Sequence, residues 1–137
     1  MFSTLLVDTV IFETPAEVNG EKLKMAANRY TTNNSSKSGV TLILTHASGT
    51  HKEHWEPVLE NLLPQLQDSS FSIHEIWAFD WQSHGDSAVL NAGIFSRHEY
   101  APTTVDWGNA LATFVKAFLM NHRIVCIGHS PLFDNML

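Results

Sequence analysis

Cysteine is nearly absent from this chain of 137 residues, which contains a single one, Cys126. One cysteine excludes a framework of internal disulfide bonds of the kind that stabilises small secreted proteins. Cys126 lies inside an apolar run, and cysteines in such runs usually pack as small hydrophobic side chains rather than act as reactive thiols. We therefore predict that Cys126 is buried.

Positive charge is also scarce, and no stretch is apolar enough for a membrane. Eight Lys and Arg are scattered among 14 Asp and Glu, for a formal net charge of −6, so no basic stripe is available to follow a phosphate backbone. No apolar run approaches the length that spans a bilayer, and residues 1–15 lack the basic flank of a signal peptide. The sequence predicts an intracellular protein with no nucleic-acid partner and no membrane span.

Apolar residues, in contrast, are abundant: 44% of the chain is hydrophobic and 16% is charged, which is typical of one globular domain. Three short runs, Val40–Thr45, Glu75–Phe79 and Ile124–Ile127, are apolar on both faces, as in parallel strands that helices cover on both sides. Between these runs, apolar residues recur every three or four positions over Trp55–Leu66 and Asp106–Asn121, which predicts two helices.

The first part of the chain predicts an antiparallel hairpin. Leu5–Phe12 and Leu23–Tyr30 are rich in strand-forming residues; Pro15 closes the first, and Asn19–Gly20 is a strong turn motif. Residues 31–38 are polar and without periodicity, which predicts a surface loop. A hairpin followed by βαβαβ predicts a three-layer α/β domain, in which ligands bind beyond the carboxyl ends of the parallel strands.

A polar segment containing glycine follows each predicted parallel strand: THASGTHKEHW, DWQSHGDS and GHSPLF. In the last, Ser130 stands two residues after Gly128, like the serine that a nucleophile elbow exposes at a tight strand-to-helix turn. In the first, the backbone N–H of Ser48 or Gly49 is placed to form half of an oxyanion hole. Taken singly, each segment is also typical of an ordinary turn.

Together the three segments resemble the N-terminal half of the α/β-hydrolase fold, and more narrowly fungal toxin-biosynthesis hydrolases and peroxisomal lipases. The resemblance extends over about Leu5–Ser130 and implies an esterase- or lipase-like acyl hydrolase with Ser130 as nucleophile and Ser48 or Gly49 in the oxyanion hole. It implies a small apolar or ester-like substrate, no cofactor and no metal ion. Residues 1–137 would then be a partial α/β-hydrolase domain, truncated after the nucleophile-elbow strand.

The sequence departs from this family pattern in two ways. The catalytic acid and then the histidine follow the nucleophile in the family, and both would lie beyond Leu137. Pro131 stands where the second oxyanion donor supplies a backbone N–H, and proline has none. We therefore predict that the chain is catalytically inert. A peroxisomal or cytoplasmic location is predicted, although Asn135–Leu137 is not an SKL-type peroxisomal signal.

Two other hypotheses stay open. A non-catalytic pseudo-hydrolase module would bind a partner or an apolar ligand through the sheet edge exposed at the strand before Ser130, and the same edge would favour chaperone binding or self-association. Alternatively, His46, His51 and His54 would hold a metal ion for hydrolysis, although their spacing matches none of the common zinc motifs.

Overall fold

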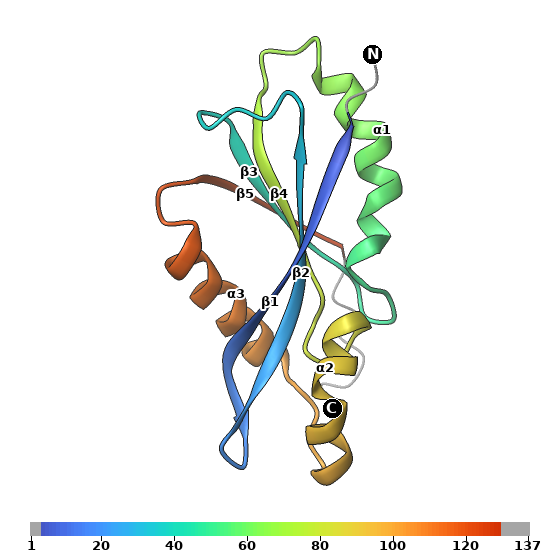
Figure 1. Cartoon of the computed structure of the whole chain (residues 1–137), viewed down its shortest axis with the longest axis vertical. Coiled ribbons are helices and arrows are strands. Elements are labelled where there is room, and N and C mark those ends of the chain that lie inside the picture. The colour runs from blue at the N-terminus through green and yellow to red at the C-terminus, as the bar shows by residue number, and fades with distance from the viewer. Residues whose placement is uncertain (1–3, 130–137) are drawn as a thin grey trace.

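The computed structural model describes residues 4–129, which form a five-stranded mixed sheet with helices on both faces (Figure 1). The strand order is β1-β2-β4-β3-β5. β1 and β2 are antiparallel to their neighbours, whereas β4, β3 and β5 run parallel. In chain order the elements are β1 (Leu5–Val18), β2 (Glu21–Thr32), β3 (Val40–Thr45), the 3-10 helix η1 (Lys52–Trp55), α1 (Glu56–Leu66), β4 (Ile73–Phe79), α2 (Gly85–Arg97), α3 (Thr104–Phe118) and β5 (Arg123–Gly128).

The three apolar runs predicted as parallel strands do form neighbouring parallel strands, with β3 between β4 and β5. Leu42 and Leu44 belong to the hydrophobic core on one face of the sheet and Ile43 to the core on the other, and each is at most 3% exposed. A strand buried on both faces has no side that faces water, so its sequence is apolar throughout. The predicted α/β class and parallel sheet are confirmed.

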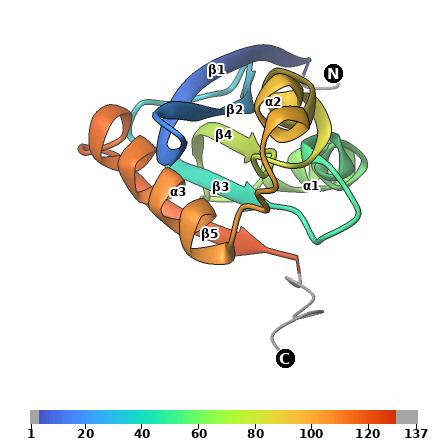
Figure 2. The ribbon, with the colours of Figure 1, turned by 90° about the horizontal axis from the view of Figure 1, so that it is seen from below.

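Helices α1 and α3 cover opposite faces of this sheet (Figure 2). Leu59 of α1 packs in the core that contains Leu42, and Phe114 of α3 packs in the core that contains Ile43. Both helices are amphipathic, as the sequence pattern predicts, and each buries part of its apolar stripe against the strands, whereas Val58 of α1 and Phe118 of α3 are exposed.

Helix α2 is absent from the sequence-based prediction. Its buried residues are the polar Ser87 and Asn91, and Val89 is 76% exposed, so the helix lacks an apolar stripe. Ser87 Oγ accepts a hydrogen bond from the Ala26 N–H (2.9 Å), and the Asn91 side chain bonds both the N–H and the C=O of Lys24 (2.8 Å each). These bonds satisfy β2 backbone groups beyond the stretch that pairs with β4.

The β1–β2 hairpin turns at Asn19–Gly20, as predicted. Both residues have positive φ, 49° and 82°, which two-residue hairpin turns of type I′ require. The prediction that the first strand ends at Pro15 is wrong, because β1 continues to Val18. Pro15 fits because β1 is an edge strand whose register shifts between Glu13 and Glu17, where a missing N–H breaks no regular ladder.

Other boundaries differ from prediction by a few residues. α3 begins at Thr104 rather than Asp106, because Thr103 accepts a hydrogen bond from the Asp106 N–H (3.2 Å) and forms a capping box with it. β2 extends to Thr32, two residues into the loop predicted over 31–38.

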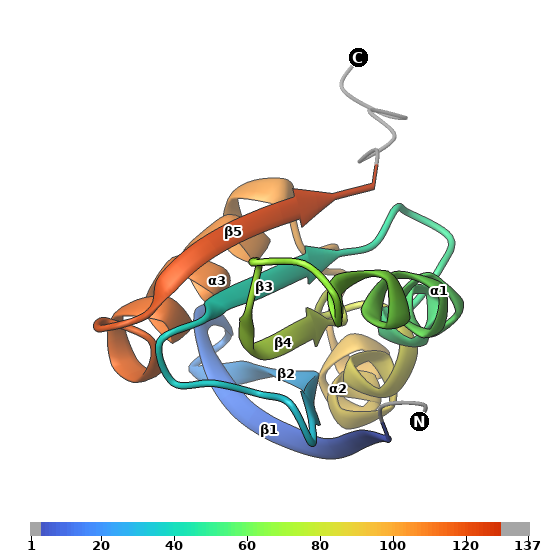
Figure 3. The same ribbon diagram turned by 90° about the horizontal axis from the view of Figure 1, so that it is seen from above.

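Strand β5 forms an edge of the sheet, and within the described part of the chain its paired neighbour is β3 (Figure 3). Val125 and Ile127 are 43% and 37% exposed. Cys126, between them, is exposed as well, so the prediction of a buried Cys126 is wrong. An apolar strand is buried only where other elements cover its faces, and the described elements leave the middle of β5 uncovered.

Candidate active site at the carboxyl ends of the parallel strands

β3, β4 and β5 end on the same side of the sheet, so the loops after β3 and β4 and the described end of the third segment, Gly128 and His129, lie at one end of the sheet (Figure 3). The backbone N–H of His129, just after β5, donates to the Thr45 carbonyl of β3 (3.0 Å). Gly128 lies so close to β3 that a Cβ at its position would be 3.1 Å from the Thr45 hydroxyl oxygen. Ser130 and Pro131 lie outside the described residues, so the assignment of Ser130 as nucleophile stays a prediction.

The loop after β3 carries both predicted oxyanion donors. Thr50 folds this loop back, because its backbone N–H and its hydroxyl both donate to the Ala47 carbonyl (3.2 and 2.9 Å). Gly49 has φ +84°, a left-handed conformation that favours glycine. It is exposed, whereas Ser48 is half-buried. The Gly49 N–H donates to His84 Nε2 at 3.4 Å. The His84 imidazole, from the loop after β4, therefore contacts the Gly49 amide, which is one of the two amides predicted to form the oxyanion hole.

His46, the first residue after β3, links the loops that follow β3 and β4. It is 1% exposed; its Nε2 accepts the Trp81 N–H (3.3 Å) and its Nδ1 lies 2.8 Å from the Ala47 carbonyl. Because Nε2 accepts, Nδ1 carries the proton. Burial lowers the pKa of His46 below its ordinary value of 6.5, so the ring is neutral at pH 7. A neutral ring with both nitrogens engaged holds structure rather than transferring protons.

A buried ion pair beneath these loops is a feature that the sequence pattern does not reveal. Neither the Lys52 nor the Asp80 side chain is exposed, and Lys52 Nζ lies 3.1 Å from Asp80 Oδ2. Asp80 also accepts the backbone N–H groups of Lys52 (2.8 Å) and Asp86 (3.0 Å). Gly85, with φ +50°, leaves the space that the Asp80 carboxylate occupies, because a Cβ at this position would lie 2.5 Å from an Asp80 oxygen. One carboxylate thus joins the loop after β3, the end of β4 and the start of α2.

Lys52 and Glu53 are both charged at neutral pH. Burial opposes the charge on Lys52, but hydrogen bonds to Asp86 and Glu53 outweigh it and raise the Lys52 pKa. Burial also acts to raise the pKa of Glu53, but hydrogen bonds from Lys52 and His51 outweigh it and lower this pKa to about 2. Glu53 is therefore an ion-pair partner and not a proton acceptor near pH 7.

The histidines of the metal hypothesis are engaged separately. His51 Nδ1 lies 2.8 Å from Glu53 Oε2, and the His54 ring stacks on His129 with centroids 5.6 Å apart, while His46 is buried as described above. Among residues 4–129, no group of three or more His, Cys, Asp or Glu side chains is arranged to hold a metal ion. These placements give no support to a metal site built on His46, His51 and His54.

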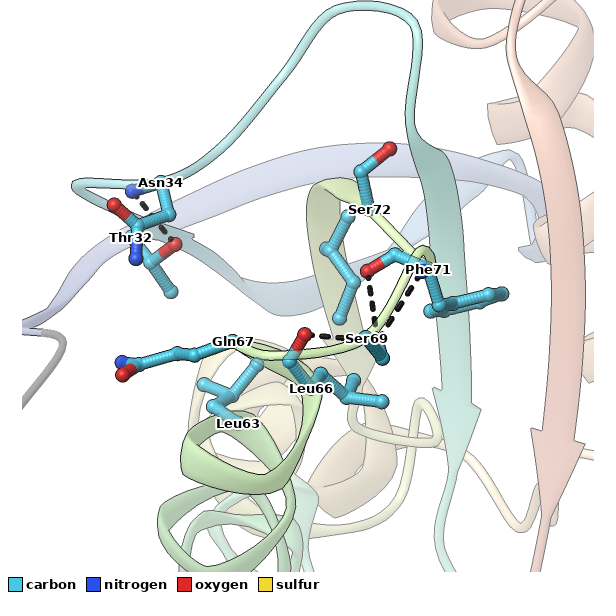
Figure 4. Close-up of a pocket in the computed structure, with 9 residues that line it drawn as sticks. Thr32, Asn34, Leu63, Leu66, Gln67, Ser69, Phe71 and Ser72 are labelled. Atoms are coloured by element: carbon cyan, nitrogen blue, oxygen red, sulfur yellow. Dashed lines mark hydrogen bonds between the residues drawn. The ribbon is translucent and has the colours of Figure 1, made fainter.

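The cavity drawn in Figure 4 lies at the other end of the sheet. Its volume is about 180 Å³, and it lies between the end of α1 and the loop that leads into β4. Leu63 and Phe71 contribute apolar surface, and Ser69 closes the end of α1 by donating its hydroxyl to the Leu66 carbonyl (2.8 Å). This cavity is lined by Ile73, the first residue of β4, whereas the candidate active site lies at the other end of that strand. The cavity and the candidate active site are therefore separate.

Comparison with known proteins gives the family of the chain. The profile described as "Alpha/beta hydrolase family" matches residues 42–132. The "Peroxisomal membrane protein LPX1" of Saccharomyces cerevisiae is 35% identical over 54 residues, which are 39% of this chain and 14% of that protein. The solved structure of the "Peroxisomal alpha-beta-hydrolase Lpx1" from Saccharomyces cerevisiae has 22% sequence identity and a TM-score of 0.67, covering 92% of this chain and 37% of that one.

The chain therefore spans well under half the length of either match, and the likeness to the solved structure is one of fold. No helix within residues 4–129 combines the length and the apolar character needed to cross a membrane. The family profile covers more than half of the residues, includes the segments after β3 and β4 and extends to Leu132 in the segment after β5, and on that match the chain belongs to the alpha/beta hydrolase family.

Proposed function

We propose that this chain is the nucleophile-bearing N-terminal part of an esterase- or lipase-like acyl hydrolase that acts on small apolar or ester-like substrates. The observation that carries the proposal is that one family match, residues 42–132, takes in the polar segments after β3 and β4 and extends to Leu132 in the segment after β5. In this proposal Ser130 attacks the acyl carbon, and the N–H of Ser48 or Gly49 stabilises the oxyanion that forms.

We further propose that the 137-residue chain by itself is catalytically inert. A serine nucleophile needs a base to accept its proton, and His46 has both ring nitrogens engaged while His84 faces the Gly49 amide. Pro131 has no N–H to serve as the second oxyanion donor, and the loss of one such donor costs about 2.7 to 4 kcal/mol of transition-state stabilisation.

Labelling with a fluorophosphonate probe tests both proposals. We expect no measurable labelling of the chain at neutral pH. Fusion to the C-terminal part of a related hydrolase, together with Pro131→Gly, is expected to give labelling that Ser130→Ala abolishes and Ser83→Ala, the control, leaves intact. Labelling of the chain alone that depends on Ser130 would contradict inertness. Labelling of the fusion that survives Ser130→Ala would contradict the nucleophile assignment.

A second candidate function is favoured by the exposure of β5. The chain would then be a non-catalytic module that binds a chaperone or a second copy of itself through this edge, where Val125 and Ile127 are 43% and 37% exposed. Size-exclusion chromatography is expected to show association that Val125→Glu reduces. A monomeric profile with a cooperative thermal transition in the unmodified chain would contradict association.

The cellular setting is a further proposal. A peroxisomal location is supported by the similarity to the peroxisomal yeast proteins, and a part in fungal toxin biosynthesis is supported by the resemblance of the three strand-end segments alone. Microscopy of the tagged full-length gene product, with the tag at the N-terminus, tests the location.

A further inference from the structure

At the end of the sheet opposite the candidate active site, an aromatic-lined pocket of about 450 Å³ lies between the last turns of α3 and strands β1, β2 and β4. Its floor is formed by Trp77, Phe114 and Phe118. The Phe114 ring centroid is 4.8 Å from that of Trp77 and 4.9 Å from that of Phe118. Phe118 is 61% exposed, so the pocket is open to solvent. Trp77 and Phe114 are 6% and 2% exposed, so the Phe118 ring supplies most of the accessible aromatic surface, which suits an apolar ligand group.

Arg29 is held in a fixed orientation above this floor. Its guanidinium carbon lies 5.9 Å from the Trp77 ring centroid, and its Nε and Nη2 lie 2.7 and 2.6 Å from Glu75 Oε2. The other Glu75 oxygen accepts the Trp77 Nε1–H (2.7 Å), and Glu75 is 3% exposed. Glu75 is therefore a buried anchor for Arg29, with both oxygens engaged, rather than a group that contacts a ligand.

Arg29 remains partly accessible in the lining of the pocket. Within residues 4–129 the side-chain hydrogen bonds of Arg29 go to Glu75, through Nε and Nη2, and its side chain is 40% exposed. A guanidinium has a second edge, formed by Nη1 and Nη2, that matches the two oxygens of a carboxylate. Because Glu75 already orients the group, an incoming carboxylate has little side-chain entropy to overcome.

The remaining polar groups of the lining are Asp8, His74 and His122. The two imidazoles stack with centroids 4.6 Å apart, and His122 Nδ1 lies 2.8 Å from the Thr41 hydroxyl. Asp8 is exposed and is the cross-strand partner of Arg29. The negative charge of Asp8 repels an anionic ligand. Water screens this exposed carboxylate, however, more strongly than it screens a charge placed against the aromatic floor.

We propose that this pocket binds a small apolar monocarboxylate, with its carboxylate on the guanidinium of Arg29 and its apolar body on the exposed ring of Phe118. The geometry supplies the two requirements of such a ligand side by side: a preoriented cation and an apolar floor. This site lies at the opposite end of the sheet from the carboxyl ends of β3, β4 and β5, and it does not depend on the proposed hydrolase function.

Three probes with the same ring system test the head group: 2-naphthoate, neutral 2-naphthylmethanol and cationic 2-naphthylmethylamine. In isothermal titration of the full 137-residue chain, we expect naphthoate to bind about tenfold more tightly than the alcohol, the gain of one charge-assisted contact. Equal affinities for naphthoate and alcohol would overturn the proposal and leave only an apolar groove. Tighter binding of the amine would overturn it in favour of a cation site at Asp8.

Two variants change the affinity in opposite directions. Asp8→Asn removes a repelling charge and is expected to tighten naphthoate binding about two- to threefold, with the alcohol unaffected. Arg29→Lys keeps the charge but loses the planar edge, and is expected to weaken naphthoate binding several-fold. Glu17→Gln, the same kind of change at the far end of β1, is the control. If Arg29→Lys does not fold, an unchanged or weakened naphthoate affinity in Asp8→Asn overturns the proposal by itself.

Discussion

Strands β3 and β5 are parallel neighbours with similar apolar sequences, VTLILT and RIVCIG, yet β3 is buried and β5 is exposed. Leu44 is 1% exposed and its register partner Ile127 is 37% exposed; likewise Ile43 is 2% exposed, whereas Cys126 beside it is exposed. β3 has a strand on each side and a helix on each face. β5 has β3 on one side in the described part of the chain. Apolar sequence therefore shows which strands can be buried, and their neighbours decide which are.

The two strands also differ in how the chain leaves them. The loop after β3 is fixed by the buried pair of Lys52 and Asp80 and by the neutral ring of His46. At the exit of β5, the described chain is held by the bond from the His129 N–H to the Thr45 carbonyl. Within residues 4–129, the loop predicted to supply an oxyanion donor is thus held by buried side-chain contacts, whereas the exit of β5 is held by a backbone hydrogen bond.

The largest effect is expected from breaking the anchor of the β3 loop. Lys52→Met leaves the Asp80 carboxylate buried without its countercharge, which is expected to lower the free energy of unfolding by about 3 to 5 kcal/mol. Arg97→Met, which breaks an exposed pair with Glu21, should cost less than about 1 kcal/mol. Urea unfolding measures both, and equal costs would show that the loop after β3 is no better anchored than the surface.

A matched pair of core substitutions tests the comparison of the strands directly. Leu44→Ala is expected to lower the free energy of unfolding by about 2 to 5 kcal/mol, because it leaves a cavity in a filled core. Ile127→Ala, at the paired position of β5, should cost about 1 kcal/mol, because part of that side chain is already in water. Denaturant titration of the two variants gives the difference. Similar losses would mean that β5 is covered as well as β3.

The pH dependence of stability is expected to report on His46. Burial lowers its folded-state pKa below 6.5, so the unfolded chain binds the proton more readily. The stability that the neutral ring contributes is complete above pH 6.5 and is lost as the pH falls through the lower folded-state value. Unfolding measured from pH 8 to pH 5 should show this decline, and His46→Gln should flatten it. His84, whose pKa burial also lowers, contributes in the same direction. A decline of the same size in His46→Gln would assign the effect to other groups.

The last test uses the reactivity of Cys126, where we expect the smallest effect on stability. A thiol reagent such as a maleimide should modify this exposed side chain in the folded protein at close to the rate for the unfolded chain. Ile43→Cys in a Cys126→Ser background places a thiol at the paired position of β3, and it should react at least about a hundredfold more slowly because access requires opening of the core. Slow modification of native Cys126 would instead show that β5 is covered in solution.

The five strands and the two helices that cover the faces of the sheet, α1 and α3, follow from patterns that are local in the sequence. The predictions for β3, β4 and β5 succeed because strands buried on both faces must be apolar throughout. The Asn19–Gly20 turn was predicted for a similar reason, since it depends on residues close in sequence. The meeting of the loops after β3 and β4 and the described end of the third segment at one end of the sheet follows from the parallel arrangement alone.

Only the tertiary structure decided the features that depend on residues far apart in the chain. Helix α2 has no apolar stripe, because Ser87 and Asn91 bury polar side chains on backbone groups of β2. The pairing of Lys52 with Asp80 joins residues 28 positions apart, and a lysine without solvent exposure is recognised only once its carboxylate partner is located. The exposure of Cys126 is of the same kind, because burial is a property of the neighbours that cover a residue and not of the residue itself.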